Sequence, residues 1–377
     1  MTGIYIHVPF CATRCSYCDF YTTTRGRQLQ DRFTQALLAE IRQRPTADRI
    51  SSVYLGGGTP SQLTAGNLSA IMEQLRMTYD LGQCTELTLE ANPDDVDDNM
   101  AATIARLGFN RVSLGVQSLD DRLLQSVGRR HSAQQALAAI DRLHAACIDN
   151  ISIDFIFGLP GQSLADWEAD LRRALSLDVQ HLSAYSLTYE SGTPLFRQRE
   201  RGEVQECDEE VSLAMFEMLI ACTAEAGFEQ YEISNFARPG RRAQHNASYW
   251  SGRPYIGLGP AAHSFDGHAT RSYNLPDLQA YIDAAEGQQP FPTEVDTLTP
   301  DEQLNEVVMT RLRTKEGIDL EAFARRFGPA KCDLLLRSAQ PYLQLGQLLL
   351  EPSPERRLHL SQSGIFISDH IIADLLQ

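Results

Sequence analysis

Three cysteines lie close together near the start of the chain. Cys11, Cys15 and Cys18 are separated by three and then two residues, and they follow an apolar segment that ends at Pro9. A structural zinc site normally needs four ligands in two spaced pairs, and no second pair of Cys or His follows at a suitable spacing. Thiolates also hold iron-sulfur clusters, and three of them around a cubane leave one iron open. The spacing therefore predicts a 4Fe-4S cluster on these three cysteines.

The other cysteines are scattered singly along the chain. A sequence of this length with one local group of cysteines does not resemble a secreted disulfide framework. We expect the single cysteines to be small buried hydrophobic residues. They are Cys84, Cys147, Cys207, Cys222 and Cys332.

Polar residues also stand in or at the end of apolar segments. Glu90 occurs in Leu-Glu-Ala-Asn-Pro, Gln117 in Gly-Val-Gln-Ser and Asp154 in Ile-Asp-Phe-Ile-Phe. A charge in an apolar strand is costly unless it has a partner. Each of these side chains is therefore either solvated or salt-bridged within the fold, or it binds a ligand.

A glycine-rich run ends another apolar segment. It consists of Gly56, Gly57, Gly58, Thr59 and Pro60. Glycine lets the backbone approach a ligand closely, although a plain tight turn has the same composition.

Up to about residue 190, expected strands and expected helices alternate along the chain. Short apolar runs rich in Val, Ile, Tyr and Phe alternate with helical patterns such as Asp31–Arg42 and Asp166–Leu177, which is typical of βα units around a parallel sheet. Six such units satisfy either an open doubly wound sheet or a partial barrel, and periodicity does not choose between them. Strands are expected at Ile4–Pro9, Ser52–Gly56, Glu86–Ala91, Arg111–Val116, Ser152–Phe157 and His181–Leu187.

The pattern changes after residue 190. An acidic helix is expected around Glu206–Ala226, followed by a polar stretch rich in Gly and aromatic residues from Gly227 to Phe265. Residues 285–300, with three prolines, are typical of a linker. We therefore expect a core at 1–190, an α+β extension at 191–285 and a small winged-helix-like domain at 300–377. Within that domain, helices are expected at Asp301–Leu312, Leu320–Phe327 and Phe366–Leu376, and strands at Leu348–Leu350 and Arg357–Leu360.

Charge and hydropathy limit the class of protein. A formal net charge of −16 repels phosphate, so nucleic acid is not an expected partner. No stretch reaches the roughly 20 apolar residues of a membrane-spanning helix, and Met1 leads into a strand pattern without a signal peptide. We expect a cytoplasmic protein that is not integral to a membrane.

The C-x3-C-x2-C loop, with an aromatic residue at Tyr17, resembles that of the radical S-adenosylmethionine (SAM) superfamily. The resemblance implies a partial (β/α)6 barrel with the cluster at its C-terminal mouth and SAM on the open iron. It also implies that Gly57, Gly58 and Thr59 belong to the motif that binds the SAM amino group.

The same resemblance implies roles for the polar candidates. Glu90, Gln117 and Asp154 would grip the ribose hydroxyls and the methionine moiety of SAM, and Arg129 would bind its carboxylate. Tyr5 and Tyr17 resemble residues that pack on SAM, although either could belong to the core. Thr188 is a weaker candidate.

Within the superfamily, His7-Val-Pro-Phe-Cys11, Gly-Val-Gln-Ser and Phe-Gly-Leu-Pro-Gly-Gln resemble the oxygen-independent coproporphyrinogen III oxidase group. This group contains decarboxylating oxidases and heme chaperones. The oxidases carry a further cysteine two residues after the triad, where this chain has Phe20, and a long N-terminal extension, whereas four residues precede Tyr5 here. Both features favour the chaperones.

A third feature is the motif His245-Asn-Ala-Ser-Tyr249-Trp250, which is typical of the chaperones. Histidine ligates heme iron, and flat aromatic rings suit a porphyrin face. His245 is therefore the candidate heme contact, with His263 as a competing ligand.

The resemblance implies a protein that binds a 4Fe-4S cluster, SAM and heme, and delivers heme to heme-requiring membrane or soluble apoproteins. One alternative is an enzyme that acts on a porphyrinogen through a 5′-deoxyadenosyl radical. Another is a binding module whose C-terminal domain recognises a partner protein.

Overall fold

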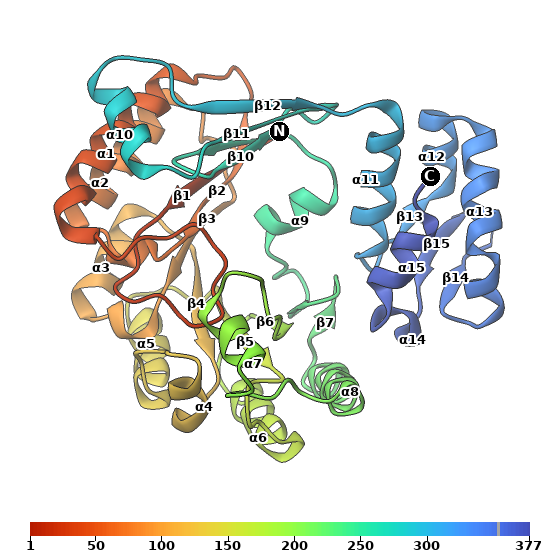
Figure 1. The fold of residues 1–377 in the computed structure, drawn as a ribbon. Coiled ribbons are helices and arrows are strands. Elements are labelled where there is room, and N and C mark those ends of the chain that lie inside the picture. The colour runs from red at the N-terminus through yellow and green to blue at the C-terminus, as the bar shows by residue number, and fades with distance from the viewer. Residues whose placement is uncertain (353–354) are drawn as a thin grey trace.

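A computed structural model describes residues 1–352 and 355–377 of the chain. Its centre is a curved sheet whose first six strands are parallel and lie side by side in chain order (Figure 1). A doubly wound sheet would reverse its strand order at a switch point, so the sequential order identifies barrel-type winding. These strands are β1 (Thr2–Val8), β2 (Ile50–Gly57), β3 (Glu86–Ala91), β4 (Arg111–Gln117), β5 (Ile151–Phe157) and β6 (His181–Ser186).

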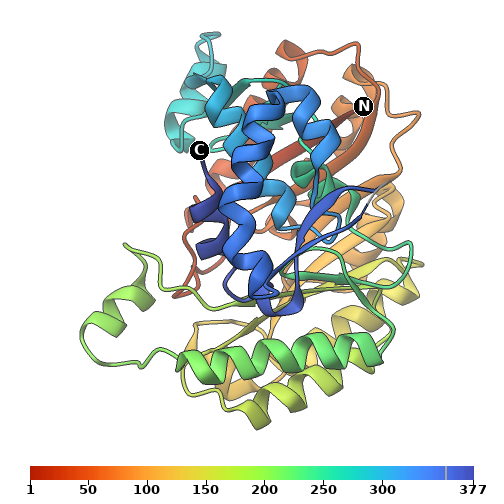
Figure 2. The same cartoon turned by 90° about the vertical axis from the view of Figure 1, so that its right-hand side faces the viewer.

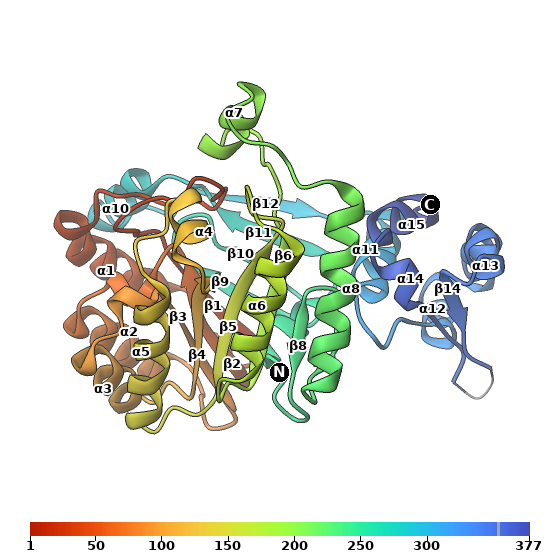
Figure 3. The same cartoon turned by 90° about the horizontal axis from the view of Figure 1, so that it is seen from below.

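The strands are covered on one face by helices that return the chain between them (Figure 3). Side chains of β1 and β5 are buried on both faces, as the continuous apolar segments predict. The covering helices are α1 (Gly26–Gln43), α2 (Ala65–Thr78), α3 (Asp98–Leu107), α4 (Asp121–Ser126), α5 (Ala133–Ala145) and α6 (Leu164–Leu175). Capping boxes stabilise the first turns of two of these helices: Ser132 pairs with Gln135 in α5, and Ser163 pairs with Asp166 in α6.

Residues after β6 extend this sheet at both edges. At the β6 edge, β8 (Asn235–Ala237) and β7 (Glu229–Gln230) pair antiparallel. At the other edge β9 (Tyr255–Leu258) pairs parallel with β1, and β10 (His263–Phe265), β11 (Thr270–Asn274) and β12 (Thr293–Thr297) continue antiparallel. The two edges do not pair with each other, so the barrel is partial. The helices of this region are α7 (Pro194–Glu200), α8 (Glu209–Glu225), α9 (Gln244–Trp250) and α10 (Leu278–Glu286).

The C-terminal unit has its own three-stranded sheet and its own hydrophobic core. Figure 2 shows this unit in front of the main sheet. Helices alternate with a small sheet whose last two strands form a hairpin, which is the arrangement of a winged helix. Its elements are α11 (Pro300–Leu312), β13 (Ile318–Asp319), α12 (Leu320–Phe327), α13 (Pro329–Gln344), β14 (Leu348–Leu350), β15 (Arg357–Leu360), α14 (Gln362–Ile365) and α15 (Ser368–Leu375).

The expected strands of the core are confirmed to within two residues at either end, and the α/β fold with a partial barrel is confirmed. The linker interpretation of residues 285–300 is wrong for Thr293–Thr297, which form β12 along β11. Helix α13 was not expected. Among the described residues, no helix has both the length and the apolar character required to cross a bilayer.

Candidate functional site

The cysteine loop leaves the C-terminal end of β1 and folds over the mouth of the barrel. Cys11 Sγ lies 3.4 Å from Thr59 Oγ1, and Arg129 Nη1 donates to Cys15 Sγ at 3.4 Å. The amide of Cys18 donates to the carbonyl of Cys15 at 3.3 Å, which closes a turn between them. All three thiols line one cavity of about 450 Å³. The structure therefore brings the predicted triad together at the predicted end of the barrel.

The chemistry of these thiols fits a cluster. Burial raises the pKa of Cys11 and raises that of Cys18 to about 11, so these thiols are neutral at pH 7 until iron displaces their protons. Among the described residues, no three His, Cys, Asp or Glu side chains converge closely enough for one metal ion. The thiolates of a cubane bind different irons and so stand apart from one another.

The glycine motif holds the cysteine loop to the end of β2. The amide of Gly58 donates to the Val8 carbonyl at 2.8 Å, and the amide of Thr59 donates to the Phe10 carbonyl at 2.8 Å. A Cβ at position 58 would lie 2.7 Å from the Val8 oxygen, so only glycine allows this approach. Gly57 has a φ of +104° and donates from its amide to Glu90 Oε2 at 3.1 Å.

Glu90 and Asp154 face the same cavity from β3 and β5. Tyr54 donates its hydroxyl to Glu90 Oε1 at 2.6 Å, and Ser113 lies 3.2 Å from both oxygens of Asp154. Burial raises the pKa of Glu90 to about 7; the Tyr54 hydrogen bond opposes this rise and the charge of Asp154 adds to it. Burial also raises the pKa of Asp154. These carboxyls are suited to accept hydrogen bonds from a polar ligand.

Arg129 and Gln117 complete this wall. The Arg129 guanidinium donates to Asn92 Oδ1 at 2.8 Å and to the Gly115 carbonyl, and its Nε is buried without a partner among the described residues. Gln117 has a φ of 69°, a strained conformation that ends β4 at the cavity. Arg130, which follows Arg129 in the chain, does not line the cluster cavity and pairs with Asp94.

Tyr17 and Thr188 also line this cavity, whereas Tyr5 does not. Tyr5 instead lines the two neighbouring cavities, one of which it shares with Glu90 and Asp154. Its packing against SAM stays a prediction. Sequence reasoning missed Asn92, Ser113 and Tyr185, which line the cluster cavity. Strand register could have found one of them, since Glu90 lies opposite Ser113.

His245 is fully buried on α9, inside the curved sheet. Its Nδ1 is 2.8 Å from Ser52 Oγ and its Nε2 is 2.8 Å from the Tyr249 hydroxyl. Burial, and then the charge of Arg111, lower its pKa to about 3, so the ring is neutral. The predicted heme contact at His245 is contradicted in this conformation, because both ring nitrogens are engaged and the side chain lines none of the three cavities described.

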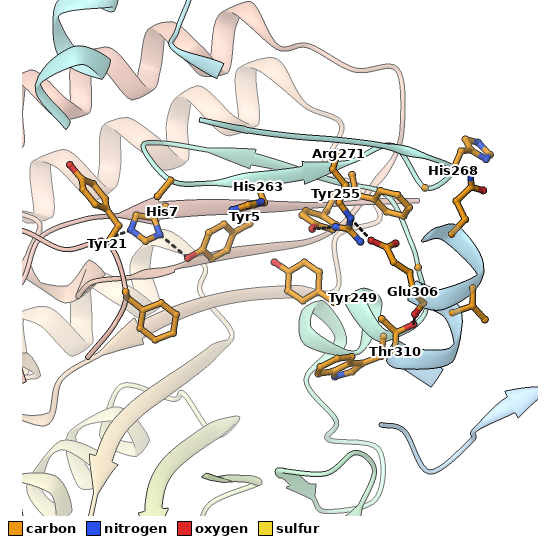
Figure 4. A pocket seen from close by; sticks show the side chains of 18 of the residues that line it. Tyr5, His7, Tyr21, Tyr249, Tyr255, His263, His268, Arg271, Glu306 and Thr310 are labelled. Atoms are coloured by element: carbon orange, nitrogen blue, oxygen red, sulfur yellow. Dashed lines mark hydrogen bonds and ion pairs between the residues drawn. The ribbon is translucent and has the colours of Figure 1, made fainter. Parts of the chain in front are cut away.

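Figure 4 shows a second cavity, which has a volume of about 550 Å³ and shares lining residues with the cluster cavity. Tyr5, Tyr249, Trp250 and His263 line it together with residues of α11 and α12 from the C-terminal unit. Asp19 and Phe20, directly after the last cysteine of the triad, line both cavities.

The chain is similar to known protein families and to curated proteins. A model of the radical SAM superfamily matches residues 5–174, and a model of the HemN C-terminal domain matches residues 298–367. The chain is 36% identical over 380 residues to the heme chaperone HemW of Mycobacterium tuberculosis (strain ATCC 25618 / H37Rv), covering 99% of this chain and 94% of the relative. It is 32% identical over 372 residues to the heme chaperone HemW of Lactococcus lactis, covering 99% and 96%.

Among solved structures, the coproporphyrinogen III oxidase HemN of Escherichia coli is similar with a TM-score of 0.85 and 21% identity, covering 100% of this chain and 90% of that chain. At this identity the similarity concerns the fold.

Proposed function

Because the chain belongs to the radical SAM superfamily and, within it, to the HemW family, we propose that it is a heme chaperone. In this proposal it binds heme in the cytoplasm and delivers it to heme-requiring membrane or soluble apoproteins. The observation that carries the proposal is the similarity over nearly the whole chain to relatives named as heme chaperones.

We assign the 4Fe-4S cluster to Cys11, Cys15 and Cys18. Support comes from the shared cavity of the three thiols and from Arg129, whose positive charge lies against Cys15. When bound, the cluster supplies one-electron chemistry and an open iron for SAM. The chain's own contribution is to hold three thiolates at the barrel mouth and to balance their charge.

We assign SAM to the same cavity. Gly57, Gly58 and Thr59 would face its amino group, Arg129 its carboxylate, and Glu90, Gln117 and Asp154 its hydroxyls and methionine moiety. Tyr17 would pack against the bound molecule. Two observations support this assignment: the buried, unpartnered Nε of Arg129 and the raised pKa of Glu90 and Asp154, which is typical of sites that await a ligand.

Anaerobic reconstitution of three proteins tests these assignments. Wild type and Cys84→Ser should take up a full complement of iron, because the Cys84 thiol contacts the Glu86 carbonyl outside the cluster cavity. Cys15→Ser should lose most of the iron and the brown absorbance. Full iron content in Cys15→Ser would overturn the cluster assignment, and a cluster-loaded wild type whose heme titration shows no Soret band from bound heme would overturn the chaperone proposal.

A further inference from the structure

The second cavity has the size and the wall composition of a cofactor site. Its volume of about 550 Å³ lies within the range of small-molecule pockets. Its wall is formed by Tyr5 and His7 of β1, by residues 19–21 after the cysteine triad, by parts of the segment 249–271, and by residues of α11 and α12 (Figure 4). The cluster cavity does not include these segments beyond Asp19 and Phe20, so the two sites are adjacent and distinct.

We propose that this cavity is the heme site of the proposed chaperone and that His263 ligates the heme iron; the inference rests on that proposed function. The His263 side chain is exposed at the cavity and makes no hydrogen bond to any described residue. Its ring stacks on that of Tyr273 with centroids 4.9 Å apart and an interplanar angle of 22°, which sets its orientation. Enclosure by its neighbours, and then the charge of Arg271, lower its pKa, so the imidazole offers a lone pair at neutral pH.

The other histidines near the cavity are less suited to bind iron. His7 uses both ring nitrogens, with Nε2 2.8 Å from the Tyr21 carbonyl and Nδ1 3.1 Å from the Tyr5 hydroxyl. His268 lies in a turn at the far end of the cavity, apart from Tyr5 and Tyr249 (Figure 4).

The wall around His263 presents flat apolar surfaces. Tyr249 and Tyr255 meet edge to face with centroids 4.7 Å apart, and Trp250 follows Tyr249 on the same helix. Aromatic rings give a large contact area to a planar ligand, which a porphyrin face requires. Phe20 adds an exposed ring on the side shared with the cluster cavity.

The C-terminal unit supplies a positive charge for a heme propionate. Arg326 on α12 donates to Gln303 Oε1 at 3.2 Å, and no described carboxylate forms a salt bridge with it. Arg271, by contrast, is already neutralised by Glu306 at 2.7 Å. Arg326 is therefore the cation available to an anionic ligand, and guanidinium binds carboxylate well.

Heme titration of the full-length, cluster-loaded chain tests this inference, with His263→Ala as the variant and His268→Ala as the matched control on the same cavity. In His263→Ala we expect a shifted Soret band and heme affinity weakened by about tenfold or more, with free imidazole restoring the wild-type band. Affinity for metal-free protoporphyrin IX should stay close to wild type, because the imidazole acts on the iron. His268→Ala should match wild type for both ligands.

Each other outcome has a defined meaning. A wild-type Soret band and affinity in His263→Ala would overturn the ligand assignment while leaving the chaperone proposal intact. Unchanged heme affinity in Arg326→Glu, together with an unchanged His263→Ala, would place heme outside this cavity. Absence of heme binding by wild type would instead remove the proposed function itself.

Discussion

The Glu90 carboxyl couples the stability of the SAM-free chain to pH. Its folded-state pKa of about 7 exceeds its ordinary value of 4.5, chiefly through burial. The folded state therefore binds more protons than the unfolded state between these two values. It follows that this group makes the protein less stable as pH rises from about 4.5 to about 7 and keeps that deficit above pH 7.

Glu90→Gln should remove this deficit, because a neutral amide keeps the acceptor for the Tyr54 hydroxyl without carrying a charge. At pH 8 the free energy of unfolding of the variant should exceed that of wild type by up to ~3 kcal/mol, and at pH 4 the two should be similar. Urea denaturation at both pH values provides the measurement. If the difference in free energy of unfolding between variant and wild type were the same at both pH values, the pKa of Glu90 would not be raised in the folded chain.

Arg129 and Arg130 offer a matched pair for testing the SAM assignment. Arg129 lies in the cluster cavity, whereas Arg130 pairs with Asp94 and Asp95 outside it. Arg129→Ala should weaken SAM binding by roughly ten- to hundredfold, the cost of one charge-assisted contact, and Arg130→Ala should have little effect. Calorimetry with the cluster-loaded protein measures both. Equal losses in the two variants would point to a general effect of charge.

For single residues, the sequence predicts which residue types form the site better than it predicts where their side chains point. The cysteine spacing predicted the triad, and the polar residues in the strands singled out Glu90, Gln117 and Asp154; all six line the cluster cavity. The orientations of Tyr5 and His245 could not be predicted, because they depend on how β1 and α9 pack against strands distant in sequence. A motif specifies the residue types of a site, whereas the packing of the elements determines which cavity each side chain faces.

Helix α9 is the element that links the motif around His245 to the second cavity. The buried carboxylate of Glu86 accepts the amides of Gln244 and His245 at the start of this helix, at 2.8 and 2.9 Å. The His245 ring then connects Ser52 to Tyr249. The histidine thus fixes Tyr249, whose ring forms part of the second cavity.

His245→Ala should therefore act on stability and not on the heme iron. The change leaves the buried hydroxyls of Ser52 and Tyr249 without their partner, which should lower the free energy of unfolding by about 2–4 kcal/mol. The Soret maximum of bound heme should stay at its wild-type position, even where affinity falls because Tyr249 is less well held. A Soret shift as large as that of His263→Ala would return the iron ligand to His245.

The six core strands, which have a buried apolar run, were predicted, whereas the exposed strand β12 was missed. Each of the first six strands has such a run, but their sequential order could not be derived from periodicity, which allowed an open doubly wound sheet as well as a partial barrel. All residues of β12 are exposed, so its sequence carries no alternation that could distinguish it from a linker. It pairs with β11 through backbone hydrogen bonds, which side-chain patterns do not record.

At the scale of the whole molecule, the position of the C-terminal unit completes the wall of the second cavity. It has a separate core, yet α11 and α12 contribute Glu306, Thr310 and Arg326 to the second cavity. Glu306 pairs with Arg271 of the main sheet, which joins the two parts beside the cavity. No local sequence pattern predicts such an interface, because its residues come from segments that are far apart in the chain.

We propose that this chain carries heme and does not oxidise a porphyrinogen, although it shares its fold with an oxidase. The most direct measurement is an anaerobic assay of the cluster-loaded protein with coproporphyrinogen III, SAM and a strong reductant, analysed by chromatography of the porphyrin products. We expect no protoporphyrinogen from a sample that binds heme in a parallel titration. Repeated turnover to protoporphyrinogen would contradict this proposal and identify the chain as a decarboxylating oxidase.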